Sequence, residues 1–148
     1  MKKIMLSALV ALIIGLAIQE QEVDQHTLAP EFVEANSALM RLSNKTGDTF
    51  FEITESADGE LSALIKTYGI RRILFHQSPI NTSVRYSFKA WFDWLTPYRY
   101  YKFSSTGYTE EDQVESIKAA IENNTKGYYH FCQKMDRNNW FYCQSQPN

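Results

Sequence analysis

The chain is poor in the residues from which most catalytic and metal sites are built. It has two cysteines and three histidines among 148 residues. A glycine-rich phosphate loop, a G-x-S-x-G turn and an H-E-x-x-H helix are all missing from the sequence. Zinc held by the two cysteines would need two further ligands, and only His76 and His130 are available in the expected folded region. We therefore expect no metal, no cofactor and no catalytic residue set.

An excess of basic residues is also missing. The chain has 15 lysines and arginines against 17 aspartates and glutamates, a formal net charge of −2. Binding to a phosphate backbone needs clustered lysines and arginines, and the one local basic doublet is Arg71-Arg72. The composition argues against a nucleic-acid-binding protein.

The one long apolar run of the sequence lies in residues 1–17, MKKIMLSALVALIIGLA. Two lysines precede an apolar run from Ile4 to Leu16, and Gly15 and Ala17 stand at the −3 and −1 positions of a cleavage site. This pattern predicts a secretory signal peptide of bacterial type, with the protein in the periplasm or secreted and free of the membrane after cleavage. An uncleaved anchor is the alternative, but the run is shorter than the roughly 20 residues that cross a bilayer.

What remains after cleavage is one domain in length. Residues 18–29 lack periodicity and are expected to form a flexible lead-in, and residues 30–148 are expected to form a single domain. Three N-x-S/T triplets, at Asn44, Asn81 and Asn123, are glycosylation acceptors only in a eukaryotic secretory route, and we expect them to be unmodified.

The two cysteines, Cys132 and Cys143, are expected to form a disulfide across a β-hairpin. Thiols of an exported chain oxidise, and a C-x₁₀-C spacing lacks the character of a redox motif. A reversal at Arg137-Asn138 lies midway between the cysteines, which then face each other directly. Closing a loop of about twelve residues contributes roughly 3 kcal/mol in the chain-entropy description.

Alternation of side chains along the two strands assigns the faces of this hairpin. The face expected to point at the core is mainly apolar and comprises Tyr129, Phe131, Gln133, Met135, Trp140, Tyr142 and Gln144. The opposite face is expected to carry the disulfide near solvent, together with His130, Lys134, Phe141 and Ser145.

Hydrophobic periodicity predicts an α+β fold with the order α-β-α-β-β-β-α-β-β. Helices are expected from Pro30 to about Asn44 and from Leu61 to Tyr68, and a third is expected after Thr109, which precedes three acids and the stripe Val114, Ile117 and Ile121. Strands are expected at 49–54, 70–77, 84–94, 98–104 and in the hairpin. The result is a mostly antiparallel sheet of about six strands with three helices, and the β-α-β segment 49–77 suggests one parallel pair.

Aromatic residues are concentrated between Val84 and Ser104. Trp91 interrupts an otherwise polar strand face, and alternation places Tyr98 and Tyr100 opposite Tyr101 and Phe103. Aromatic rings interleaved with basic residues are typical of protein-binding and sugar-binding surfaces. We predict a binding surface that contains Trp91, Tyr98, Arg99, Tyr101 and Phe103. The alternative is that both faces of the sheet are covered and these rings belong to the core.

Two functions are compatible with these patterns. The first is an exported, non-catalytic binding module whose partner is an unknown protein or an envelope glycan. The second is a small periplasmic hydrolase with its site near His76, two residues before Ser78. A serine–histidine pair also needs a third group that orients the base, and the sequence does not show one. We therefore favour the binding module.

Overall fold

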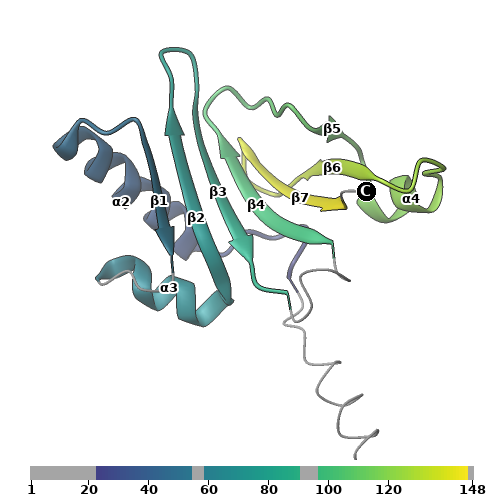
Figure 1. Cartoon of the computed structure of the whole chain (residues 1–148), viewed down its shortest axis with the longest axis horizontal. Helices are drawn as coiled ribbons and strands as arrows, with labels where there is room; N and C mark the ends of the chain where they lie inside the picture. The colour runs from purple at the N-terminus through teal and green to yellow at the C-terminus, as the bar shows by residue number, and fades with distance from the viewer. Residues whose placement is uncertain (1–22, 55–58, 91–96, 147–148) are drawn as a thin grey trace, which may run out of the picture.

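The described part of the chain forms a seven-stranded sheet with three helices (Figure 1). The computed structural model describes residues 23–54, 59–90 and 97–146. The predicted signal peptide at 1–17 and Trp91 of the predicted binding surface therefore lie outside the described residues. The strand order is β1-β2-β3-β4-β7-β6-β5. The elements are α2 (Pro30–Thr46), β1 (Phe50–Thr54), α3 (Glu60–Tyr68), β2 (Ile70–Gln77), β3 (Thr82–Phe88), β4 (Tyr98–Ser104), β5 (Asp112–Gln113), α4 (Ile117–Glu122), β6 (Tyr129–Lys134) and β7 (Trp140–Gln146). The predicted α+β class is confirmed, with one strand more than expected.

The main core lies between the helices and one face of the sheet, which we call the inner face. Phe32 of α2 is fully buried, and its ring contacts the rings of Tyr86, Phe88 and Tyr101 from β3 and β4. Buried side chains of α3 and α4 belong to the same cluster. No helix in the described ranges is long and apolar enough to cross a membrane.

The first two helices end where the sequence predicts. Gly47 follows α2 with φ 79° and Gly69 follows α3 with φ 61°, and both are left-handed positions that glycine adopts without steric cost. Phe32, Ala35 and Leu39 of α2 are buried, whereas Leu42 near the end of the helix is exposed.

The parallel pair expected at 49–77 does not form, because β1 and β2 are antiparallel. A parallel crossover requires the helix to run back along the length of the sheet. Figure 1 shows instead that α3 lies across the end of the sheet where β1 stops and β2 begins. The parallel pair in this sheet joins β5 to β6, with Asp112 opposite Phe131.

The third helix begins later than predicted. It covers Ile117–Glu122 and is capped by Ser116, whose hydroxyl accepts a hydrogen bond from the Ala119 N–H at 3.3 Å. Thr109 is therefore not an N-cap. The acids after Thr109 were expected in a first helical turn, where a carboxylate gains about 0.3–1 kcal/mol from the helix dipole. Glu111 accepts four hydrogen bonds instead, two of them in ion pairs, which outweighs that gain.

The C-terminal hairpin has the predicted register, and the predicted disulfide is confirmed. Cys132 pairs with Cys143 across β6 and β7, and their sulfur atoms are bonded. The expectation that the disulfide lies near solvent is wrong, because both cysteines are 0% exposed. Tyr100 of β4 and Phe141 of β7 pack with the cysteines in a second buried cluster, on the face opposite the helices.

The described part of the lead-in predicted to be flexible, residues 23–29, is fastened to the inner face. Leu28 is 2% exposed, and its N–H donates to the Asp136 carboxylate at 2.9 Å. The Gln25 carbonyl accepts from the side chain of Gln133, and the Asp24 carbonyl accepts from the Tyr101 hydroxyl. Buried polar groups of the sheet are thus paired with the backbone of this segment.

Candidate functional site

The face of the sheet opposite the helices, which we call the outer face, is only partly covered. Residues 105–111, which we call the strap, leave β4 and lead toward β5 (Figure 1). The backbone of Ser105 is bonded to Thr82, and Thr109 of the strap is buried with its hydroxyl 3.9 Å from the sulfur of Cys132. The strap therefore covers the disulfide side of the outer face. No helix in the described residues packs on the outer face over β1, β2 and β3.

A carboxylate whose side chain is 11% exposed, that of Glu111, holds the strap to the sheet. Glu111 accepts hydrogen bonds from Lys102 at 2.6 Å, Arg85 at 3.1 Å and the Tyr100 hydroxyl at 3.0 Å. The Thr109 hydroxyl donates to the same carboxylate and accepts from the Lys102 ammonium group at 3.1 Å. Arg85 also lies 4.5 Å from the centre of the Tyr100 ring. Each member of this cluster has a partner, which is the condition under which buried charges are tolerated.

The ionisation of Glu111 is strongly perturbed by these contacts. Burial alone would raise the pKa of Glu111, but hydrogen bonds from Lys102 and Thr109 and the charge of Lys102 outweigh burial and lower it to about 2. A carboxyl group whose pKa is lower in the folded protein stabilises the fold above its unfolded pKa and loses that contribution as the pH falls.

We therefore predict that the free energy of unfolding declines as the pH is lowered from about 4.5, the ordinary value for the carboxyl group, toward about 2. The reason is that Glu111 must be protonated in the unfolded chain long before it is protonated in the folded protein. Denaturant titrations at pH 6 and pH 3 measure this difference. The variant Glu111→Gln should show a smaller difference than the wild type, and an equal difference in both proteins would contradict the prediction.

A groove of about 770 Å³ opens on the outer face beside the strap. Its floor comes from β2, β3 and β4, and its walls come from the start of β1, the β2–β3 turn and the strap. The lining residues are Phe50, Leu74, His76, Ser78, Ile80, Asn81, Ser83, Val84, Arg85, Lys102, Thr106, Tyr108, Thr109 and Glu110. We call it the outer groove.

The outer groove gathers the most exposed apolar side chains of the described protein. Ile80 is 85% exposed, Tyr108 is 64% exposed and Phe50 is 62% exposed. They come from three different segments, namely the tip of the β2–β3 turn, the strap and the first residue of β1. Scattered apolar residues on a surface need no explanation, whereas these three line one concave surface.

His76 lies in the outer groove without the companions that a catalytic base requires. Its ring makes an edge contact with Phe50, with the ring centres 6.3 Å apart. The hydroxyl of Ser78 is engaged with the backbone of Asn81, donating to its carbonyl and accepting from its N–H at 3.0 Å. Within the described chain no hydroxyl or carboxylate is hydrogen-bonded to His76, so a nucleophile, a base and an orienting acid are not brought together.

The residues predicted from the aromatic segment do not share one surface. Tyr98 lies on the outer face and is 45% exposed, whereas alternation along β4 directs Arg99, Tyr101 and Phe103 to the inner face. Tyr101 is 4% exposed and takes part in the core around Phe32, so its ring is not available to a partner. Apart from Tyr98, the residues of β4 are buried or half-buried on both faces of the sheet.

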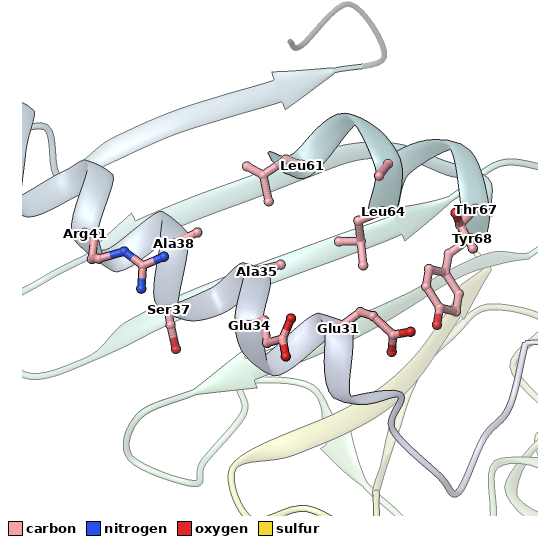
Figure 2. Close-up of a pocket in the computed structure, with 11 residues that line it drawn as sticks. Glu31, Glu34, Ala35, Ser37, Ala38, Arg41, Leu61, Leu64, Thr67 and Tyr68 are labelled. Carbon is pink, nitrogen blue, oxygen red and sulfur yellow. The ribbon is translucent and has the colours of Figure 1, made fainter. Parts of the chain in front are cut away.

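A second concave surface lies between α2 and α3 (Figure 2). Its floor is lined by small and aliphatic side chains, including Ala35 and Leu64, and Glu31 points toward Tyr68 at one end. Burial raises the pKa of Tyr68, and the charge and hydrogen bond of Glu31 raise it further. None of the strongly exposed apolar side chains of the described residues lines this surface. It offers a partner less apolar area than the outer groove.

Comparisons with known proteins leave the geometry as the basis for assigning function. No family model, curated protein or solved structure matches the chain. In the part of the chain that the structure describes, no cluster of three histidine, cysteine, aspartate or glutamate residues is arranged to hold a metal ion.

Proposed function

We propose that this protein is an exported, non-catalytic interaction domain that binds an apolar segment of a partner protein in the outer groove. The observation that carries the proposal is that Phe50, Ile80 and Tyr108, the three most exposed large apolar side chains described, line the same groove. Burying one such side chain contributes about 1.5–3 kcal/mol. These three side chains form the apolar centre of the proposed contact.

The chemistry of the groove favours a protein over a glycan as partner. Ile80 is the most exposed side chain of the three and has no polar group with which to orient a sugar. Phe50 and Ile80 match apolar side chains, and the Tyr108 ring combines an apolar body with a hydroxyl. The oxidised cysteine pair supports export, because disulfides persist outside the reducing cytosol.

Capture of a cross-linked partner from an extract of the producing cells tests the proposal. We expect the variant Phe50→Ser/Ile80→Ser/Tyr108→Ser to lose the partner that the wild type captures, with a fall in affinity of about 2 kcal/mol or more, roughly 30-fold. All three side chains are exposed, so the free energy of unfolding should change by only about 0.5 kcal/mol at each position.

A matched variant controls for general stickiness. The change Leu42→Ser/Tyr98→Ser/Tyr128→Ser removes three other exposed apolar side chains that do not line the outer groove. This control should capture the same partner as the wild type. Equal capture by the groove variant, or equal loss in both variants, would contradict the proposal, and capture that resists protease but not glycosidase would replace the protein partner by a glycan.

A further inference from the structure

One edge of the sheet is formed by β1, which borders the outer groove through Phe50 (Figure 1). The order of the sheet gives β1 a single neighbour, β2, among the described strands. An edge strand presents backbone N–H and C=O groups that a further strand can pair with.

The backbone groups that point outward from this edge can be identified. In an antiparallel ladder the hydrogen-bonded pairs alternate with non-bonded pairs. The Gln77 N–H donates to the Thr49 carbonyl at 2.7 Å, so the bonded pairs continue at Phe51 and Ile53. The N–H and C=O groups of Phe50 and Glu52 therefore point away from β2.

The side chains of β1 divide between the two faces in the same alternation. Phe50 and Glu52 are exposed and lie on the outer face. Phe51 and Ile53 are half-buried against the inner core, and Phe51 stacks on Phe75 with ring centres 4.6 Å apart. A strand added at this edge would place apolar side chains beside Phe51 and Ile53, on the inner face. Its residue opposite Glu52 would lie on the outer face.

The charge of Glu52 decides which strand fits. No ion pair joins Glu52 to another described residue. Two copies of β1 paired antiparallel about their centres would place Glu52 opposite Glu52, and like charges directly opposite each other destabilise a strand pair. A lysine or arginine at that position stabilises the pair instead.

We propose that the edge of β1 pairs with an extended segment of the partner protein, with apolar residues opposite Phe51 and Ile53 and a lysine or arginine opposite Glu52. The inference rests on the proposed function and adds to it the conformation and charge of the bound segment. Main-chain hydrogen bonds to Phe50 and Glu52 supply affinity, and the alternating side chains supply specificity, as in other cases of strand addition.

Two synthetic peptides test the pairing. One has the central sequence Thr-Val-Lys-Val-Tyr between Gly-Ser and Ser-Gly ends, and the other has glutamate in place of lysine. We expect the lysine peptide to shift the amide signals of Phe50 and Glu52 in NMR spectra and to slow their hydrogen exchange at least about tenfold, because these are the outward amides. The amides of Phe51 and Ile53 are already bonded to β2 and should change little.

Two further comparisons isolate the charge and the backbone. The wild type should bind the lysine peptide about fivefold more tightly than the glutamate peptide, and Glu52→Lys should reverse this preference. Methylation of the backbone nitrogen of the peptide's lysine removes a donor to Glu52 and should abolish binding. Methylation of the following valine nitrogen, which points away from β1, should leave binding intact.

The outcomes separate this inference from the proposed function. If neither peptide changed the NMR signals or the hydrogen-exchange rates of the Phe50 and Glu52 amides, the strand addition would be overturned. This would hold even if the groove variant still failed to capture the partner. Protection of these amides together with full capture by the groove variant would overturn the groove as the binding site. Protection that rises with protein concentration in the absence of peptide would show that a second copy occupies the edge, which also overturns the inference.

Discussion

Replacing Glu111 by leucine is expected to lower the free energy of unfolding by about 3–5 kcal/mol. Lys102 is 8% exposed as a residue, and the substitution leaves its ammonium group without the counter-charge that lies 2.6 Å away. It also removes the acceptor shared by Arg85, Tyr100 and Thr109. Chemical denaturation monitored by tryptophan fluorescence measures the loss.

Two companion variants identify the cause. Glu110→Leu removes the neighbouring, exposed carboxylate and should change the free energy of unfolding by about 0.5 kcal/mol or less. The double variant Lys102→Met/Glu111→Leu removes both charges of the buried pair and should recover most of the loss, because a buried ion pair and an apolar pair of similar volume are nearly equivalent. A double variant as unstable as Glu111→Leu would show that the cost does not come from an unpaired charge.

Replacing Phe32 by alanine is expected to lower the free energy of unfolding by a similar amount, about 3–5 kcal/mol. The Phe32 ring is completely buried and contacts the rings of Tyr68, Tyr86, Phe88 and Tyr101. Its removal leaves a cavity at the point where α2, α3 and the inner face of the sheet meet. A thermal unfolding scan should show a midpoint roughly 10–20 °C lower.

The exposed Glu34 on the same helix provides the control for Phe32. Glu34→Ala keeps the helix propensity high and removes no buried contact, so its midpoint should stay close to that of the wild type. If Phe32→Ala unfolded at the same temperature as Glu34→Ala, α2 could not be a fixed part of the core.

Local signals in the sequence were sufficient for the C-terminal hairpin and for the first two helices. The register of β6 and β7 follows from a turn midway between Cys132 and Cys143, and the helix ends follow from Gly47 and Gly69. Each of these features depends on residues within about a dozen positions of one another, so pattern and spacing are enough to predict it.

The segment from Thr109 to Gln113 shows where such reasoning fails. Threonine followed by three acids is a good helix start, and nothing nearby in the sequence contradicts it. The competing partners of Glu111 are Lys102 and Arg85, which lie on two other strands. Their combined attraction is stronger than the local preference, and it becomes visible only when the pairing of β3 with β4 is known.

The outer groove was missed for a related reason. Phe50, Ile80 and Tyr108 are far apart in the sequence, and each alone reads as an ordinary apolar residue. Two of them carried a usable signal. Alternation in β1 places Phe50 on the face of the sheet away from the half-buried Phe51, and Ile80 lies between Pro79 and Asn81 at a turn. The position of Tyr108 depends on the fold of the strap and has no such signal.

The position of β7 between β4 and β6 has a consequence for the synthesis of the chain. The strands β1 to β4 follow one another as a meander, but the next neighbour of β4 is the last strand of the sheet. A chain that has emerged only as far as α4 therefore contains the described helices and the residues of β1 to β5, while the second edge of β4 is still without β7. Unpaired strand edges and uncovered apolar surface make such intermediates prone to aggregate. Until Trp140 and Tyr142 arrive, the inner core lacks these two rings and the open edge of β4 can pair with another copy of the chain.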